Sequence, residues 1–503
     1  MSNYSIFKEL VFWLQSIIFL CLIFVILMII ITAIADAIQR KDAIRHNYPF
    51  IGRFRNLFMH LGVFFRAYFF SEDRAEKPFN RADREWVYHA SSGVSMESAF
   101  GSTRTLDTPG TFVFTNAAFP PLDKDHSQPS HITFGPYVEK PYCTEKFFHI
   151  SAMSYGALSK HAVRALSHGA KMAGIFMDTG EGGIAPYHLE GDCDLVAEIG
   201  TAKYGYRTED GKLDDNKLLE AAALPQVKMF SLKLSQGAKP GKGGILPGEK
   251  VTEEIAKIRG IRVGQDSVSP NRWPEISNIY ELLDMIDHVR QLTRKPVGCK
   301  FVVGDKKWFE ELCQEIIKRG IESAPDFIII DSSDGGSGAA PMALMDYMGL
   351  QIRESLPMIV DILIGYNLRE RVKVGCSGKM ITPGYVAAAL CMGADFVNSA
   401  RGFMFSLGCI QAMRCNKNTC PTGVTTHNPR LQAGLDPQLK KVKVMNYANT
   451  MHRKVGMIAH SCGVDDPREL SREHVHIVTE DRRTVSIATI WPYPQAGILL
   501  KSN

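Results

Sequence analysis

The sequence predicts an α/β protein: a (β/α)8 TIM barrel with an N-terminal transmembrane helix and an irregular N-terminal cap. Three observations lead to this fold class. Between residue 147 and about residue 408, short apolar runs rich in β-forming residues alternate with stretches of helical pattern. Most of these runs end in Gly, Ser, Lys or acidic residues, and barrels build their active sites at that edge. Near the N-terminus, 26 successive residues carry no charged side chain.

Composition places the bulk of the chain among folded globular proteins. Its 503 residues allow two or three domains, or one large barrel with additions. The hydrophobic share of 45% and the charged share of 22% exclude the disordered and fibrous classes. The 58 Lys and Arg against 53 Asp and Glu leave a net charge of +5, too little to indicate a nucleic-acid partner. Eleven cysteines, a sparse and odd number, favour a reducing compartment over a disulfide framework.

The uncharged stretch, residues 10–35, follows a short segment of residues 1–9 and predicts a transmembrane helix. At about 1.5 Å rise per residue it reaches about 39 Å, more than the ~30 Å of a hydrocarbon core. A cleaved signal peptide is the alternative, because Ala33-Ile34-Ala35 resembles a cleavage site. The apolar run is about twice as long as the core of a signal peptide, which favours the spanning helix.

The basic residues around this helix predict its orientation. Positive charge gathers on the cytoplasmic side of membrane spans. Lys8 alone precedes the span, whereas five basic residues follow it closely. We therefore expect a single-pass protein of the cell membrane, with its N-terminus outside and its catalytic part in the cytoplasm. The residues that follow the span are Arg40, Lys41, Arg45, Arg53 and Arg55.

Residues 36–146 are predicted to form an interfacial helix and a cap. In residues 50–70, aromatic side chains mix with three arginines, a composition typical of helices that lie in a membrane interface. The alternative, a linker helix packed on the main domain, stays open. Residues 71–146 contain Pro and Ser and show weak periodicity, which predicts an irregular cap.

The predicted barrel occupies residues 147–408. Eight strands in about 260 residues match the length and strand number of a (β/α)8 barrel. A doubly wound open sheet is the alternative, and the unusual residues at the strand ends favour the barrel. The candidate strands are residues 148–154, 174–180, 227–234, 266–270, 296–303, 326–331, 371–375 and 394–399.

Two glycine-containing loops predict a phosphate site. They lie at residues 375–378 and 399–402, at the ends of the last two strands, where barrels commonly bind phosphate on backbone N–H groups. Lys300, at the end of the fifth strand, would point into the barrel mouth and could stabilise negative charge on a reduced flavin. The alternative is a structural lysine paired with Asp331 or Glu181.

Three cysteines follow the eighth strand within twelve residues: Cys409, Cys415 and Cys420, the last before Pro421. Clustered thiolates that end in Cys-Pro suggest iron–sulfur ligation, in a loop over residues 409–430. Three ligands fit a [3Fe–4S] cluster or a [4Fe–4S] cluster with an open iron. Zinc is the runner-up, although structural zinc usually takes four ligands from paired motifs, and purely structural cysteines are the third possibility. A helical extension and tail, residues 431–503, complete the chain.

These motifs carry a resemblance to a known family. The region from about 147 to 465 resembles the FMN-binding synthase domain of glutamate synthase, and the layout resembles the small membrane-anchored glutamate synthase-like proteins of bacteria. The matching segments, in the order of the family, are SAMSYGALS at 151–159, TGEGG at 179–183, QGAKPG at 236–241, DGGSGA at 334–339 and the cysteine cluster.

The resemblance implies a TIM barrel with two cofactors. A [3Fe–4S] cluster is expected on Cys409, Cys415 and Cys420. FMN is expected on the turn after the first strand, on the lysine of the fifth strand and on the two phosphate loops. The implied FMN-binding residues are Ser151, Ala152, Met153, Ser154, Lys300, Gly375, Ser377, Gly378, Ser399, Arg401 and Gly402.

The resemblance also implies an oxidoreductase that acts on CH–NH2 donors. In the family, the cluster passes electrons to FMN, which reduces 2-iminoglutarate, formed from 2-oxoglutarate and ammonia, to L-glutamate. Lys239 and Arg259 are expected to clamp the substrate carboxylates, and Glu181 to serve as the acid–base group at the nitrogen. For Arg259, a structural ion pair with Glu253 or Glu254 on its own helix is the alternative.

The sequence also departs from the family. Ile245 stands where a Gln of the dicarboxylate site is expected, and a lost hydrogen bond to a charged group costs roughly 1–3 kcal/mol. A different 2-oxo acid or amino acid therefore stays open as the substrate. The membrane span and cap take the place of the family's amidotransferase domain, so we expect no glutaminase activity. The sequence has no dinucleotide fingerprint, and the expected electron donor is a ferredoxin-like or membrane redox partner.

Two other functions stay open. One is an FMN-dependent oxidoreductase that acts on another 2-oxo, hydroxy or amino acid. A hydroxy-acid oxidase would need a histidine base at the barrel mouth, and no histidine ends the fifth to eighth strands. The other is a cofactor subunit of a membrane electron-transfer complex, against which the presence of both Lys239 and Arg259 argues.

Overall fold

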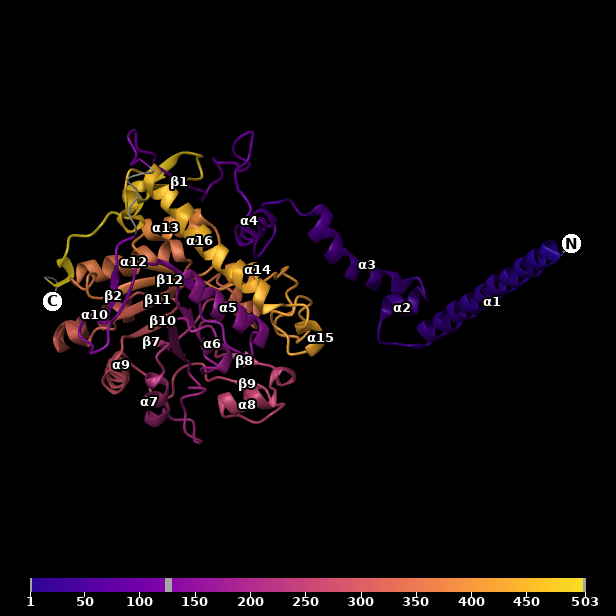
Figure 1. Ribbon diagram of the computed structural model, residues 1–503, viewed down its shortest axis with the longest axis horizontal. Coiled ribbons are helices and arrows are strands. Elements are labelled where there is room, and N and C mark those ends of the chain that lie inside the picture. The colour runs from indigo at the N-terminus through magenta and orange to yellow at the C-terminus, as the bar shows by residue number, and fades with distance from the viewer. Residues whose placement is uncertain (1, 123–128, 501–503) are drawn as a thin grey trace. The chain divides into compact units, whose positions relative to one another are not determined.

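The computed structural model describes residues 2–122 and 129–500, and contacts group the chain into two compact units, Met1–Ala82 and Asp83–Asn503 (Figure 1). The first unit is helical. Its longest helix contains the predicted span: the segment Tyr4–Ile38 is long and apolar enough to cross a membrane, and its apolar window is not buried. The elements of this unit are α1 (Ser2–Ile38), α2 (Ala43–Asn47), α3 (Gly52–Phe65) and the π-helix η1 (Arg66–Phe70).

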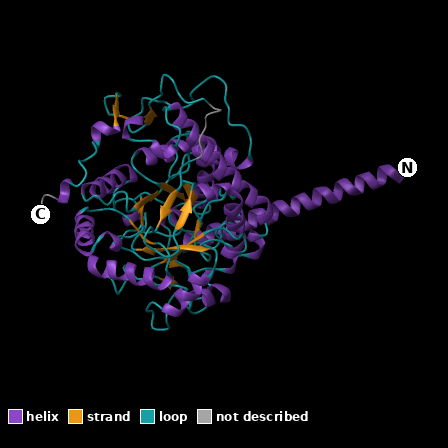
Figure 2. Ribbon diagram, turned by 60° about the vertical axis from the view of Figure 1, so that its left-hand side comes forward, coloured by secondary structure: helices purple, strands orange, loops and turns teal. Residues whose placement is uncertain are grey.

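In the second unit, eight parallel strands close into a barrel that helices surround, which confirms the predicted (β/α)8 fold (Figure 2). Lys300 on the fifth strand lies level with Lys233 on one neighbouring strand and with Ile329 on the other. The strands, in order around the barrel, are β4 (Phe148–Ile150), β5 (Met177–Asp178), β6 (Leu195–Ile199), β7 (Val227–Lys233), β10 (Val297–Phe301), β11 (Phe327–Asp331), β12 (Lys373–Ser377) and β13 (Phe396–Ser399).

Helices connect the strands, and their apolar faces are buried. In α5, for example, Val163, Leu166 and Ala170 share one buried face. The helices between the strands are α5 (Lys160–Ala173), α6 (Pro186–Leu189), α7 (Asp215–Ala223), α8 (Glu253–Arg259), α9 (Ile279–Thr293), α10 (Lys307–Arg319), α11 (Met342–Met345), α12 (Ile352–Gly365) and α13 (Pro383–Cys391), with the 3-10 turns η3 (Gly248–Lys250) and η4 (Ile321–Ser323).

The structure corrects one of the eight predicted strands. The run at 266–270 is not part of the barrel: β9 (Ser267–Val268) pairs antiparallel with β8 (Ile245–Leu246) in a separate two-stranded sheet. The third barrel strand is β6 instead, which follows β5 after the single-turn helix α6. Its charged Glu198 interrupts the apolar run, and this hides the strand from a hydrophobicity pattern.

An aromatic layer closes the amino-terminal end of the barrel. The hairpin of β2 (Ile132–Phe134) and β3 (Tyr142–Thr144) brings Phe134 and Tyr142 into one buried cluster with Phe327 and Phe396, which begin β11 and β13. The ring of Phe134 lies 5.7 Å from that of Phe327 and 5.4 Å from that of Phe396, distances typical of edge-to-face packing. The site must therefore lie at the opposite, carboxyl end of the strands.

The remaining elements pack outside the barrel. Asn446 and Thr450 of the long helix α16 donate hydrogen bonds to the carbonyls of Ser91 and Ala90 at the end of α4. The strand β1 pairs with β14, so the cap and the C-terminal extension share a small sheet. These elements are α4 (Arg81–Ser92), β1 (Phe112–Phe114), α14 (Arg401–Ser406), α15 (Pro429–Gln432), α16 (Pro437–Ser461), η5 (Pro467–Glu469), η6 (Arg472–His474), β14 (Val475–Val478), β15 (Thr484–Ser486), α17 (Ile487–Ile490) and η7 (Ile498–Leu500).

Candidate active site

A cavity of about 1250 Å³, which includes solvent space at its mouth, lies at the carboxyl ends of the barrel strands. This is the end at which barrel enzymes bind their ligands. Residues far apart in the sequence meet there, among them most of those predicted from the sequence. The predicted residues that line the cavity are Ser151, Ala152, Met153, Ser154, Glu181, Lys239, Arg259, Lys300, Ser377, Gly378, Ser399, Arg401 and Cys415.

Two predicted glycines, Gly375 and Gly402, are not among the lining residues, and both are tightly packed. Gly375 lies inside β12, where a Cβ atom would come within 2.3 Å of the Phe396 ring. At Gly402 a Cβ atom would lie 2.1 Å from the Tyr447 hydroxyl. Both positions therefore exclude a side chain because neighbouring aromatic residues fill the space.

The loops after β12 and β13 form one end of the cavity. Gly378 has φ +111°, and a Cβ atom there would lie 2.4 Å from Ser332 Cβ, so only glycine fits. Ser377 Oγ donates to Asp331 Oδ1 over 2.6 Å, which ties this loop to β11. A glycine turn followed by a helix, here α13, is the arrangement that binds phosphate on backbone N–H groups.

Lys300 is buried, lines the cavity and pairs with a carboxylate that the sequence analysis missed. Its Nζ lies 3.7 Å from Glu198 Oε2 on β6. The ion pair thus involves neither Asp331 nor Glu181, the two partners considered from the sequence. Burial alone would lower the pKa of Lys300, but the charges of Glu198, Asp331 and other carboxylates outweigh it and raise that pKa above its usual value. Lys300 therefore stays a cation.

The surroundings of Glu198 bear on whether the cavity fits FMN. Both its carboxylate oxygens are buried, and neither accepts a hydrogen bond from the residues that the structure describes. Glu198 therefore offers a free hydrogen-bond acceptor, and Lys300 beside it offers a donor. This pair suits a ligand that carries N–H and C=O groups next to each other, as the isoalloxazine ring of FMN does. With the glycine turn at Gly378, the cavity offers groups that fit both the ring and the phosphate of FMN.

A second buried carboxylate lies beneath this pair. Asp178, on β5, is buried, and its Oδ1 accepts the Gly180 N–H over 2.9 Å. Burial, and then the charge of Glu198, raise the pKa of Asp178 well above its usual value. Burial therefore favours the protonated form of Asp178 more than it would for an exposed aspartate, and Glu198 is the carboxylate that pairs with Lys300.

Three buried cations surround Glu181 at the other side of the cavity. Lys233 Nζ lies 3.1 Å from Glu181 Oε2 and also donates to Gln236 Oε1. Burial alone would raise the pKa of Glu181, but Lys233, Lys239 and Arg259 together outweigh it and hold the pKa below its usual value. Glu181 is therefore an ionised carboxylate. Lys233 and Gln236 line the cavity but were not predicted as site residues, although Gln236 begins the matched QGAKPG segment and Lys233 lies three residues before it.

Lys239 and Arg259 are both 4% exposed, so the two predicted substrate cations are deeply buried. Burial lowers the pKa of Lys239 to about 8, against the opposing pull of Glu181. Arg259 donates from Nη1 to Ser267 Oγ and from Nη2 to Ser154 Oγ, and its buried Nε has no partner in the described residues. The side chain of Ile245 lines the same region.

Arg259 does not form the alternative ion pair within its own helix. Glu254 instead accepts hydrogen bonds from the Tyr155 hydroxyl over 2.5 Å and from the Tyr187 hydroxyl over 2.8 Å. These two bonds tie α8 to the turn after β4 and to α6. The same ties hold Arg259, at the end of α8, at the cavity.

The three predicted metal ligands follow α14, and one of them, Cys415, lies beside two buried or partly buried cations. Arg401 Nη1 lies 3.6 Å from Cys415 Sγ, and Lys250 Nζ donates to the carbonyl of Cys415 over 3.2 Å. The charge of Cys420 influences the pKa of Cys409, which burial raises. Thiol donors with neighbouring cations suit a thiolate-bound cluster. Among the described residues, no group of three Cys, His, Asp or Glu side chains is close enough to hold a metal ion.

Comparison with known proteins identifies the family. Residues 113–465 match the family model of the conserved region in glutamate synthase. The chain belongs to the glutamate synthase family. The family match covers the barrel, the cavity and the cysteine loop, and it confirms the resemblance seen in the sequence.

Relatives of this glutamate synthase family member support the assignment. The glutamate synthase large subunit-like protein YerD of Bacillus subtilis (strain 168) is 39% identical over 493 residues, 90% of this chain and 93% of YerD. The archaeal-type glutamate synthase (NADPH) of Thermotoga maritima is 30% identical over 317 residues, 63% of this chain and 59% of that protein. Among solved structures, a flavocytochrome b2 mutant with pyruvate bound aligns over 80% of this chain and 85% of that chain, at 14% identity and a TM-score of 0.44. The family relationship identifies the protein as a glutamate synthase-like oxidoreductase.

Proposed function

We propose that this protein binds FMN and an iron–sulfur cluster and reduces 2-iminoglutarate, formed from 2-oxoglutarate and ammonia, to L-glutamate. The observation that carries the proposal is the placement of two buried cations, Lys239 and Arg259, in the cavity that also holds Lys300 and the glycine turn at Gly378. One cavity thus offers groups for a dicarboxylate and for a flavin nucleotide.

The reaction needs two electrons and two protons at a C=N bond. FMN, when bound, supplies the hydride that adds to the imino carbon, and a proton adds to the nitrogen. Lys239 and Arg259 each bind one substrate carboxylate, which orients the imino carbon for the transfer. The orphaned Nε of Arg259 provides a donor for this role.

Glu181 and Lys239 have different roles in proton transfer. Ionised Glu181 can accept a hydrogen bond or a proton from the incoming nitrogen. Lys239, with its pKa lowered to about 8, can give a proton near neutral pH. Lys233, paired with Glu181, keeps that carboxylate ionised and in place.

The cysteine loop is proposed to hold a [3Fe–4S] cluster through Cys409, Cys415 and Cys420. Arg401, which lines the cavity, contacts the cysteine loop directly. Its Nη1 lies near Cys415 Sγ, and its Nη2 donates to the Ser337 carbonyl over 2.6 Å. A ferredoxin-like or membrane redox protein is the proposed electron donor. Helix α1 is proposed to anchor the protein in the cell membrane with the barrel in the cytoplasm.

A hydroxy-acid oxidase is the less favoured alternative. No histidine is among the described residues that line the cavity, so the base that such an enzyme would need is not placed there. Reduction of another 2-oxo acid with ammonia stays compatible with the same two cations. Flavin reoxidation with different 2-oxo acids, with and without ammonium, distinguishes these cases.

Anaerobic flavin reoxidation tests the reaction. The dithionite-reduced protein is mixed with 2-oxoglutarate and ammonium, and flavin absorbance and glutamate are measured together. We expect stoichiometric reoxidation and glutamate formation, and loss of both in Lys239→Ala and Arg259→Ala with the flavin content unchanged. Reoxidation by a 2-oxo acid without ammonium, with a 2-hydroxy acid as the product, would contradict the proposed reaction. Reoxidation by another 2-oxo acid in preference to 2-oxoglutarate would contradict the proposed substrate.

Metal analysis tests the cluster. We expect about three irons per chain, and loss of that iron with retained FMN in Cys409→Ser, Cys415→Ser and Cys420→Ser. Cys462→Ser, at a buried cysteine outside the loop, is the matched control and should keep its iron. Zinc, or iron that survives all three substitutions, would refute the assignment.

A further inference from the structure

An apolar surface of the N-terminal unit stays exposed in the described residues. On α3, five large apolar side chains recur at helical spacing and therefore share one face, with exposed fractions from 37% to 64%. The π-helix η1 extends this face. We call it the α3 face; it consists of Phe54, Leu57, Phe58, Leu61 and Phe65, with Tyr68 and Phe69 from η1.

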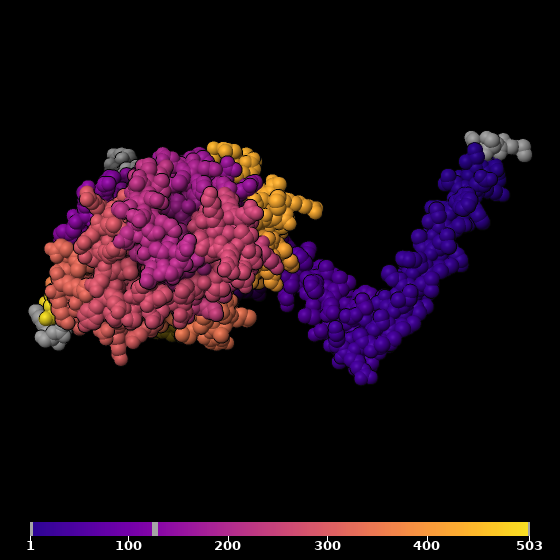
Figure 3. All heavy atoms as spheres, turned by 90° about the horizontal axis from the view of Figure 1, so that it is seen from below, coloured from indigo at the N-terminus to yellow at the C-terminus, as the bar shows by residue number. Residues whose placement is uncertain are grey.

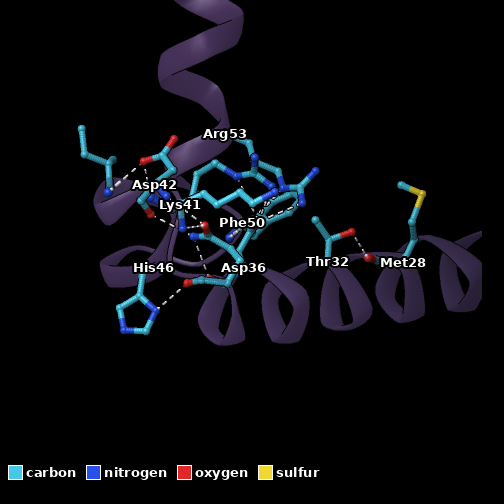
Figure 4. Close-up of polar contacts among 11 residues, drawn as sticks. Met28, Thr32, Asp36, Lys41, Asp42, His46, Phe50 and Arg53 are labelled. Carbon is cyan, nitrogen blue, oxygen red and sulfur yellow. Dashed lines mark hydrogen bonds and ion pairs between the residues drawn. The ribbon is translucent and has the colours of Figure 1, made fainter.

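A buried carboxylate ties α3 to the end of α1. The side chain of Asp36 is fully covered, and its oxygens accept four hydrogen bonds from two guanidinium groups (Figure 4). Arg45 on α2 donates through Nε and Nη2 over 3.1 and 2.6 Å. Arg53 on α3 donates through Nε and Nη2 over 2.6 and 2.8 Å. We call this set of contacts the Asp36 clamp.

The backbone around the clamp is also closely packed. The Phe50 N–H donates to Asp36 Oδ2 over 3.2 Å, so the turn between α2 and α3 joins the same carboxylate. At Gly52, a Cβ atom would lie 2.9 Å from the Ile44 carbonyl oxygen, which shows that α2 and α3 are in direct contact. The chain therefore changes direction sharply after α1, as the bend of the indigo segment shows (Figure 3).

Charge is placed at the borders of the α3 face. At about 100° per residue, Arg55 and Arg66 fall about 100–120° from the centre of that face, while Asn56 lies on the opposite side. Arg53 falls at the same border, but its guanidinium group is held by Asp36 in the clamp. Arginines in this position extend their guanidinium groups toward lipid headgroups while the apolar face enters the membrane boundary. From residue 36 to residue 70, six Lys and Arg stand against two Asp, a balance that suits anionic lipids.

We propose that α3 and η1 form a second membrane-contacting element, which lies in the interface of an anionic phospholipid bilayer with the α3 face in the acyl boundary. The Asp36 clamp sets its angle to α1. This inference rests on the proposed membrane location of α1. The Asp36 clamp joins the α3 face to the α1 span. The apolar α3 face suits the acyl region of the bilayer, and its basic borders suit the headgroup region.

Photocrosslinking of the full-length protein tests the occupant of the α3 face. Phe58 on that face, Asn56 on the opposite side and Phe19 within α1 are each replaced by p-benzoylphenylalanine. The proteins are placed in nanodiscs of phosphatidylethanolamine and phosphatidylglycerol, irradiated and analysed by mass spectrometry. We expect lipid adducts at positions 58 and 19 and none above background at position 56. Exchange of phosphatidylglycerol for phosphatidylcholine should reduce the adducts at position 58 alone.

The other outcomes separate this inference from the proposed anchor. Lipid adducts at position 19 with crosslinks from position 58 to the barrel, or to a second copy of the chain, would overturn the inference and leave the anchor intact. Loss of lipid adducts at position 19 would overturn the anchor itself. In Asp36→Asn, we expect fewer lipid adducts at position 58 and unchanged adducts at position 19, with flavin content as the check on folding; unchanged adducts at position 58 would refute the role of the clamp.

Discussion

On the proposed function, Lys239 sets a pH limit on substrate binding because burial lowers its pKa to about 8. Below this pH the free enzyme presents a cation to the substrate carboxylate, and above it the amine is neutral. We expect kcat/KM for 2-oxoglutarate to fall as the pH rises through 8, because this parameter reports the pKa values of the free enzyme. The measurement is a series of initial rates at low 2-oxoglutarate concentration across that pH, with the concentration of free NH3 held constant. Lys239→Arg should remove the decline, and a flat profile in the parent protein would contradict the assignment.

Glu198 places a negative charge beside Lys300 and so opposes the effect of that cation on the flavin. Glu198→Gln keeps the size of the side chain and removes the charge. Since a reduced flavin carries more negative charge than an oxidised one, we expect a higher midpoint potential in this variant. Equilibration with a redox dye measures the potential. Lys300→Met should shift it in the opposite direction, and equal potentials in the parent and Glu198→Gln would refute the effect.

At the scale of the element, α8 shows how a short helix can position Arg259, a proposed substrate-binding residue. Two tyrosine hydroxyls from different elements donate to Glu254 in its first turn, and Arg259 lies in its last turn. A helix of seven residues is too short to be stable alone, so these outside contacts fix its position. The orientation of Arg259 therefore depends on Glu254, which lies outside the cavity.

We expect Glu254→Ala to raise KM for 2-oxoglutarate while kcat and flavin content change little. Loss of two hydrogen bonds to a partly solvated carboxylate costs about 1–2 kcal/mol, or roughly a five- to thirtyfold change in an equilibrium. Steady-state kinetics measure it. Glu253→Ala is the matched control, because Glu253 lies in the same helical turn without those tyrosine bonds; an equal rise of KM in both variants would count against the role of Glu254.

At the scale of the whole molecule, the barrel unit has its own core and its own aromatic layer at the amino-terminal end. We expect deletion of residues 2–70 to leave a protein with the flavin content and Tm of the parent, because the core of the barrel lies within Asp83–Asn503. Flavin absorbance and calorimetry of the two proteins measure this. A deletion variant that lacks flavin or melts at a much lower temperature would show that the N-terminal unit is part of the folding core.

Much of this architecture could be predicted from the sequence because it depends on local pattern. The alternation of apolar runs and helical stretches predicts the barrel, and the position of each loop after its strand predicts the cavity. Pairings between side chains that are distant in the sequence could not be predicted, because they depend on how separate strands and helices are placed in the folded chain. Examples are Glu198 as the partner of Lys300 and the two tyrosines that bind Glu254. Gly375 and Gly402 look like phosphate-loop glycines in the sequence, but only the folded chain shows the rings that exclude a side chain there.

The aromatic layer beneath the barrel also governs how small solutes reach the reaction. Phe134, Tyr142 and their neighbours fill that end, so on the proposed function ammonia and the dicarboxylate would share the mouth at the opposite end. Among the described residues that line the cavity, Lys and Arg outnumber Asp and Glu by seven to three, so an approaching ammonium ion meets net repulsion while uncharged NH3 does not. On the proposed function, the effective nitrogen substrate is then the neutral gas, present as a small fraction of total ammonium at neutral pH. A neighbouring enzyme that releases NH3 close to the mouth would supply it better than the bulk solution.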